Sequence, residues 1–175
     1  MVVNLSRLIY IFFIFTIFLN ASDINFQKTL EKFKKNYKDS LEMALNKTEY
    51  CAKKANKNSI NKLMLKNINL QKKVLQNALF YLSVRNNLIC EEKTLDKLVI
   101  DTSNYLFALK RYDEKNIDLQ NKIEGELKSY QFSVYSSKRL MYESKENYEK
   151  ISDSDKKKLN KIKELKSVFN FDDLM

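Results

Sequence analysis

The near-absence of glycine and proline limits this chain more than any other feature of its sequence. Its 175 residues include one Gly and no Pro, whereas an average chain of this length has roughly a dozen Gly and about nine Pro. Hairpins and tight turns depend on these two residue types. The sequence therefore excludes an all-β or doubly wound α/β fold and predicts an all-α protein.

Apolar residues recur at steps of three and four along most of the chain, which is the spacing of amphipathic helices. The runs with this spacing are residues 30–52, 70–82, 95–112 with a continuation to 141, and 153–169. Ser152 and Asp155 have the Ser-x-x-acid pattern of a helix capping box. The pattern predicts an elongated helical bundle, or an antiparallel helical hairpin, of four to five helices.

Asparagine-rich stretches mark the predicted breaks between these helices. Asn56–Ser59 and Asn67–Asn69 weaken the apolar pattern, and Asn86–Asn87 is a third break, followed by Thr94 as a predicted N-cap. The stretches are too short to be linkers between domains. We therefore expect residues 22–175 to form a single helical domain.

The N-terminal segment differs from the rest of the chain. Arg7 is the only charged residue before Asp23, and the apolar run Leu8–Leu19 follows it. This run has the length of a signal-peptide core and falls short of the roughly 20 residues of a membrane-spanning helix. We predict a signal peptide over residues 1–21 and a periplasmic or secreted protein. The alternative is a protein that residues 1–22 anchor in the membrane.

The chain is basic, with 32 Lys and Arg against 22 Asp and Glu and a net charge of +10. Most of the cations are lysine, whereas nucleic-acid sites favour the planar fork of arginine. An exported protein also meets little nucleic acid, so we expect none as a partner. The predicted partner is an envelope protein or an anionic envelope surface, and a homo-oligomer remains an alternative.

The chain has two cysteines, Cys51 and Cys90, and in an exported protein such a pair predicts a disulfide. The two Cα atoms must then lie within about 7 Å, whereas 39 residues of straight helix span about 58 Å. The chain must reverse between them. Symmetry of the two helices predicts the reversal near Asn67–Leu70 rather than at Asn56–Ser59. Unpaired buried thiols and an intermolecular bridge are the alternatives.

Composition also limits the chemistry of the chain. There is no His, which removes the commonest general base and metal ligand. One Gly is too few for a glycine-rich phosphate loop. Adjacent acids such as Glu91 and Glu92 point to different sides of a helix rather than forming a catalytic pair. We therefore expect a protein that is not an enzyme, with no catalytic, cofactor-binding or metal-binding residues.

The predicted C-terminal helix, residues 153–169, is basic and amphipathic. Its lysines are candidates for contact with an anionic surface: Lys156, Lys157, Lys158, Lys161, Lys163 and Lys166. Such a helix lies on a membrane or docks on a partner. The alternative is that its apolar side packs on the bundle and its lysines are solvated. Membrane contact is expected only here or through the N-terminal segment.

These features predict an exported, non-catalytic helical binding protein of the cell envelope. One alternative is a structural subunit of a secretion or conjugation apparatus. Another is a secreted inhibitor of a hydrolase such as lysozyme. From Ile89 to Leu98 the chain resembles the cysteine-bearing module of secreted bacterial lysozyme inhibitors. The separation of the two cysteines is longer here than in that module, so the chain is not assigned to that family.

Overall fold

The computed structural model confirms the predicted all-α fold. It describes the backbone of residues 5–58 and 60–174, and the side chains of residues 25–58, 60–172 and 174. These residues form five α-helices and two short 3₁₀ helices and no strand. The elements are α1 (Leu5–Lys57), α2 (Lys62–Leu65), α3 (Lys72–Tyr112), α4 (Ile117–Glu149), α5 (Asp153–Lys161), η1 (Lys163–Lys166) and η2 (Asp172–Leu174).

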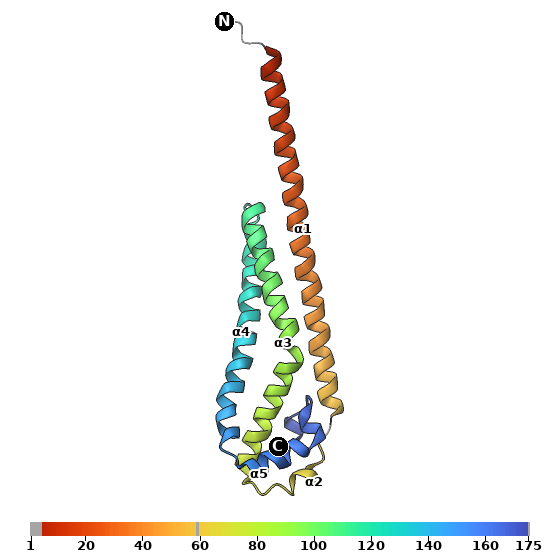
Figure 1. The fold of residues 1–175 in the computed structure, drawn as a ribbon, viewed down its shortest axis with the longest axis vertical. Coiled ribbons are helices and arrows are strands. Elements are labelled where there is room, and N and C mark those ends of the chain that lie inside the picture. Colours follow the sequence, from red (N-terminus) through yellow and green to blue (C-terminus); the bar gives the residue numbers. More distant parts are fainter. Residues whose placement is uncertain (1–4, 59, 175) are drawn as a thin grey trace.

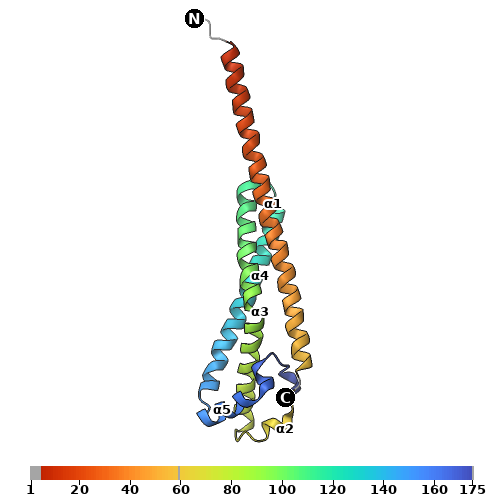
Figure 2. The ribbon, with the colours of Figure 1, turned by 45° about the vertical axis from the view of Figure 1, so that its right-hand side comes forward.

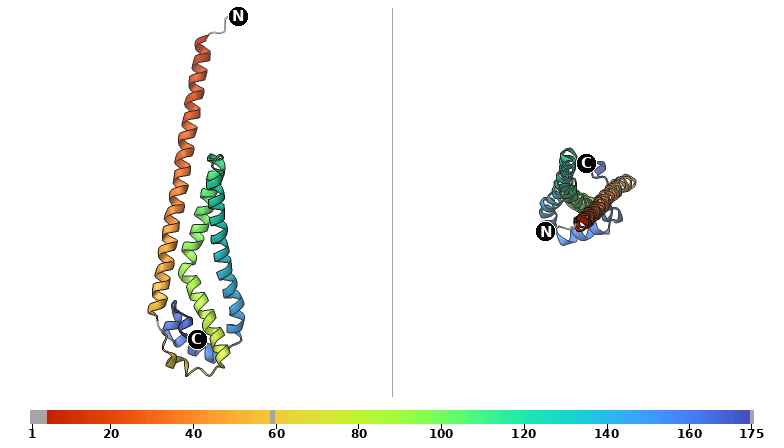
Figure 3. Two further views of the ribbon diagram at one scale, coloured as in Figure 1. Left: turned by 180° about the vertical axis from the view of Figure 1, so that it is seen from behind. Right: turned by 90° about the horizontal axis from the view of Figure 1, so that it is seen from above.

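Three long helices, α1, α3 and α4, form an elongated bundle in which α3 packs against both of the others (Figure 1). Neighbouring helices run antiparallel. Helix α1 has 53 residues, so it is about 80 Å long, and its N-terminal end projects past the turn between α3 and α4 (Figures 1 and 3).

The predicted signal peptide falls on this projecting end of the molecule. Residues 1–4 lie outside the described residues, and Leu5 to Ala21 belong to α1. Within the described part of the chain, no helix combines the length and the hydropathy needed to cross a membrane. The signal peptide and its cleavage remain predictions.

One group of buried side chains lies where α1, α3 and α4 run side by side. We call it the three-helix core: Tyr37, Ala44, Leu98, Tyr105, Leu106, Leu109 and Ile123. The rings of Tyr37 and Tyr105 stack with their centroids 5.5 Å apart. The Tyr37 hydroxyl donates a hydrogen bond to Glu126 of α4, and burial raises the pKa of Tyr37. Tyr37 therefore connects all three helices.

A second group lies at the opposite end, where the C-terminal segment (residues 151–174) replaces α1 against α3 (Figures 2 and 3). We call it the C-terminal core: Ile60, Ile68, Ala78, Leu79, Tyr81, Leu82, Tyr148, Ile151, Leu159, Leu165 and Phe169. Helix α1 ends at Lys57, about 9 Å beyond Cys51, whereas α3 extends about 27 Å beyond Cys90 to Lys72. The C-terminal segment fills the resulting space.

This difference in helix length corrects the predicted reversal. A single reversal near Asn67–Leu70 is wrong, because α1 already ends at Lys57 and the whole connection from Asn58 to Gln71 forms the reversal. Helix α1 ends inside the first asparagine-rich stretch, and the second, Asn67–Asn69, lies in the connection. Symmetry failed as a guide because α1 and α3 do not end at the same level.

Two further predicted boundaries also differ from the structure. Asn86–Asn87 and Thr94 lie inside the continuous helix α3, where the Thr94 hydroxyl donates to the Glu91 carbonyl at 2.8 Å. The predicted helix 153–169 ends early: α5 stops at Lys161, and Ile162 has extended backbone with ψ of 110°. Ser152 is the predicted N-cap of α5: the Asp155 amide donates to Ser152 Oγ at 3.2 Å, and the Ser152 hydroxyl donates to the Asp155 carboxylate at 2.7 Å.

Candidate anion-binding site

A disulfide joins α1 to α3 close to the end of α1. It links Cys51 and Cys90, whose Cα atoms are 6.2 Å apart, so the predicted pairing is present. Cys51 is only 1% exposed. The crosslink fixes the position of α1 along the axis of α3. It therefore also determines which side chains of the two helices face each other next to the disulfide.

A pocket of about 320 Å³ lies directly beside this disulfide. We call it the basic pocket. It is lined by residues of α1, α3 and the C-terminal segment: Lys47, Tyr50, Lys54, Arg85, Asn86, Ile89, Cys90, Lys166, Ser167 and Val168. Three segments that are distant in sequence therefore meet at one site, and the disulfide holds two of them together.

The lining carries four cationic side chains and no carboxylate. Within the described part of the chain, none of Lys47, Lys54, Arg85 and Lys166 has a carboxylate partner. The Lys47 ammonium lies 4.7 Å from the centroid of the Tyr50 ring. The Arg85 guanidinium donates to Asn86 Oδ1 at 3.1 Å. An anion that enters the pocket meets uncompensated positive charge in a concave, partly desolvated site.

Ser167 supplies a second reason to interpret this pocket as a binding site. Its Oγ is buried, and it is the one buried side-chain N or O atom without a hydrogen-bond partner among the described residues. Buried hydroxyls are normally paired, so each exception needs an explanation. Here the residue that carries the unpaired hydroxyl is one of those that line the basic pocket, so a buried polar group without a partner lies next to a positively charged site.

Two asparagines hold the part of the chain that carries Lys166 and Ser167. Asn86 Nδ2 donates to the carbonyls of Leu165 and Ser167 at 2.8 and 2.7 Å. Directly after the end of α1, Asn58 Nδ2 donates to the carbonyls of Glu164 and Val168, both at 2.8 Å. These bonds give partners to backbone groups that have left regular helix. The segment is therefore positioned before any ligand arrives.

A second pocket of about 390 Å³ adjoins the first and shares Lys54 and Ser167 with it. It is lined further by Lys57, Asn58, Lys163 and Glu164. The positive surface therefore continues from the basic pocket to the end of α1.

The structure places the six predicted surface lysines in different surroundings. Lys166 lines the basic pocket and Lys163 the adjoining one. Lys156 pairs with Glu149 at 3.2 Å and Lys158 with Asp155 at 3.1 Å, while Lys157 and Lys161 are exposed on α5.

The apolar side of the predicted amphipathic helix is buried inside the protein. Leu159, Leu165, Val168 and Phe169 are each at most 3% exposed. This corresponds to the alternative interpretation of that segment, in which its apolar side packs on the bundle. It leaves only the charged side for outside contacts.

Only Cys90 and Lys166 of this lining were predicted as site residues from the sequence, and the other eight were not: Lys47, Tyr50, Lys54, Arg85, Asn86, Ile89, Ser167 and Val168. The spacing of Lys47, Tyr50 and Lys54 was visible in the sequence, since residues three and four apart on one helix share a face. Only the packing of α1 on α3 and on the C-terminal segment adds the remaining walls.

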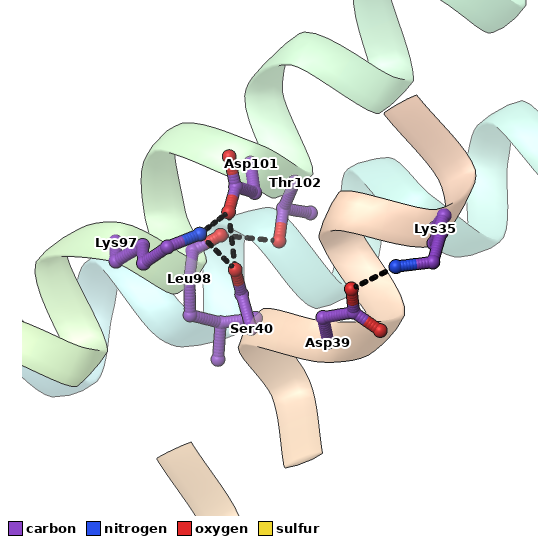
Figure 4. Close-up of polar contacts among 7 residues, drawn as sticks. All are labelled: Lys35, Asp39, Ser40, Lys97, Leu98, Asp101 and Thr102. Carbon is purple, nitrogen blue, oxygen red and sulfur yellow. Dashed lines mark hydrogen bonds and ion pairs between the residues drawn. The ribbon is translucent and has the colours of Figure 1, made fainter. Parts of the chain in front are cut away.

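A polar cluster between α1 and α3 contains residue types that occur in catalytic sites (Figure 4). The Ser40 hydroxyl donates to the Asp101 carboxylate, and the Lys97 ammonium donates to Ser40 Oγ at 2.9 Å and pairs with Asp101. Serine and lysine form the nucleophile and base of some hydrolases. Ser40 is 1% exposed, however, so a substrate has no access to its hydroxyl, and we interpret the cluster as a contact between helices.

No protein-family model, curated protein or solved structure matches this chain. In the described residues, no group of three or more Cys, Asp or Glu side chains is arranged to hold a metal ion. The function is therefore argued from the geometry of the basic pocket.

Proposed function

We propose that this protein is an exported, non-catalytic binding protein of the cell envelope that holds an anionic group of its partner in the basic pocket. One observation carries the proposal. Among the described residues, four cations without carboxylate partners line the same pocket as Ser167, whose buried hydroxyl is unpaired. Positive charge without internal compensation is typical of a surface that attracts and orients an anionic partner.

Export is supported by two independent features. The first is the apolar run behind Arg7, which has the pattern of a signal peptide. The second is the disulfide, since such bonds persist mainly in oxidising compartments outside the cytosol. N-terminal sequencing of the protein from cells is expected to begin at Ser22. An intact Met1 on membrane-bound protein would favour the anchored alternative, and on cytosolic protein it would contradict export.

Titration with pyrophosphate, followed by calorimetry, tests the pocket directly. Arg85→Gln and Lys166→Gln are each expected to weaken binding about tenfold, the effect of losing one hydrogen bond to a charged group. Raising the ionic strength should weaken binding further because salt screens the attraction.

Lys157→Gln is the matched control, since it removes the same charge from an exposed site on α5 outside the pocket. It is expected to change the affinity less than twofold. Equal weakening by all three variants would mean that pyrophosphate binding depends on net charge alone. This result would contradict the proposal that the basic pocket binds the anion.

A structural subunit is the second candidate, favoured by aromatic residues on the outer side of α4. Phe132, Tyr135 and Tyr142 are 71, 64 and 66% exposed, which is unusual for side chains of this size. Sedimentation analysis distinguishes the two. Concentration-dependent assembly that Phe132→Asn abolishes would favour the subunit, and a monomer at all concentrations would favour the binding protein.

A further inference from the structure

Large apolar side chains are exposed on α1 and α3 next to the basic pocket. On α3 they are Ile89, Ile100 and Phe107, which are 66, 59 and 62% exposed. On α1 they are Met43 and Tyr50, which are 49 and 52% exposed. Together we call these five residues the apolar face.

Helical register places each row on one side of its helix. Residues seven or eleven apart point in nearly the same direction, and these are the separations within both rows. The two rows lie on the same side of the α1–α3 interface, because Tyr50 and Ile89 both line the basic pocket. The apolar face is therefore continuous with that pocket and runs from it toward the α3–α4 turn.

Helix α4 does not cover this side. It meets α3 through a different row that includes Leu88 and Leu95, which share a small pocket with Ser137 and Leu140 of α4. Helix α4 and the three-helix core thus lie on one side of the groove between α1 and α3, where a pocket of about 590 Å³ lined by Thr48, Ala52 and Asn87 remains, while α4 leaves the other side of the groove uncovered. A fourth helix placed there would complete a four-helix arrangement.

The rim of the apolar face is positively charged. Helical register places Lys93 and Arg111 on the same side of α3 as Ile100, and both side chains are exposed. The carboxylates nearest to this side already have partners: Asp39 pairs with Lys35 at 2.9 Å, and Asp96 pairs with Lys138 at 3.7 Å. A second copy of the chain would bring the same positive rim, and like charges repel.

We infer that the apolar face receives an acidic amphipathic helix of a partner protein. Apolar residues of that helix cover the five exposed side chains, and its carboxylates meet the cationic rim and the basic pocket. From Ile89 to Phe107 the face is about 27 Å long, which five turns of helix would cover. The inference rests on the proposed function and adds that the partner of the pocket is a polypeptide helix.

A designed peptide of about 20 residues tests this. It carries leucine at helical spacing on one side and glutamate elsewhere, and a control peptide keeps the leucines but carries lysine. Binding is measured by fluorescence anisotropy. The acidic peptide is expected to bind the protein, and the basic peptide at least tenfold more weakly.

Two pairs of matched variants locate the contact. Ile100→Asn and Phe107→Asn are each expected to weaken binding of the acidic peptide at least tenfold. Phe132→Asn and Tyr142→Asn remove equally exposed side chains from α4 and are expected to change it less than twofold. Circular dichroism of each variant verifies that the helices remain formed.

Three results would overturn the inference. In the first, the acidic peptide binds equally well to all four variants. In the second, sedimentation shows a dimer that Phe107→Asn disrupts. In the third, the protein binds vesicles of phosphatidylglycerol through this face and does not bind the acidic peptide. Pyrophosphate binding that remains sensitive to Lys166→Gln in any of these cases would leave the proposed function standing.

Discussion

The two ends of this bundle differ in how the backbone polar groups of the packed segments find hydrogen-bond partners. In the three-helix core, α1, α3 and α4 meet as regular helices, and their backbone groups bond within each helix. In the C-terminal core, an irregular segment replaces α1, and its carbonyls need side-chain partners such as Asn58 and Asn86. Regular helices leave few polar groups to satisfy, whereas an irregular segment needs a specific partner for each.

The difference explains where the binding site lies. Between regular helices, the buried polar residues Ser40 and Asp101 bond to each other and present nothing to solvent. Beside the irregular segment, three parts of the chain approach at different angles and leave a pocket with unpaired groups. The basic pocket therefore lies beside the irregular segment rather than between the regular helices.

The disulfide lies between the two regions, and its removal is expected to have the largest effect. Cys51→Ser and Cys90→Ser should each lower the free energy of unfolding by about 4 kcal/mol, as loop closure over this length predicts. The double variant should be no worse than either single one, because both remove one crosslink. Urea denaturation measures all three. Additive losses would contradict the shared role.

Asn86→Ala tests the C-terminal core by leaving the carbonyls of Leu165 and Ser167 without partners. Unsatisfied buried carbonyls are expected to lower stability by about 2–3 kcal/mol and to weaken pyrophosphate binding. Hydrogen exchange in residues 163–168 should become faster. Asn87→Ala, on the next position of the same helix, is the control. Comparable losses in both variants would show that the two carbonyl bonds are unimportant.

Ser40→Ala tests the polar contact of the three-helix core. We expect a loss of about 1 kcal/mol, the net value of one hydrogen bond, and unchanged pyrophosphate binding. Ser103→Ala is the control, because the Ser103 hydroxyl donates to Val99 of its own helix, at 2.8 Å. If the Ser40 variant is as stable as this control, the Ser40–Asp101 hydrogen bond does not stabilise the contact between α1 and α3.

Glu91→Gln is expected to have the smallest effect, and one that depends on pH. Burial raises the pKa of Glu91, so ionisation disfavours the folded state and lowers stability as the pH rises above the ordinary pKa of about 4.3. The variant should therefore melt slightly higher than wild type at pH 7 and equally at pH 3. Glu92→Gln is the control, since Glu92 pairs with Lys138 at 3.1 Å. A stabilising effect of Glu91→Gln at pH 3 would contradict this explanation.

Sequence alone was sufficient for the helices and for the need to reverse the chain. The scarcity of glycine and proline and the spacing of apolar residues can both be read within a short stretch of sequence. Helix formation depends largely on such local features. The N-cap at Ser152 is equally local. The predicted disulfide added one short distance between residues that are remote in sequence. That distance required the helices that carry the two cysteines to run antiparallel.

Only the tertiary structure decided where the helices end and which residues form the site. Asn86 predicts a break because asparagine competes for local backbone bonds, yet α3 continues through it because its amide bonds to Leu165 and Ser167 instead. The end of α1 depends in the same way on the C-terminal segment that takes its place. Such partners lie about 80 residues away, and no local pattern specifies which distant carbonyl an amide will meet.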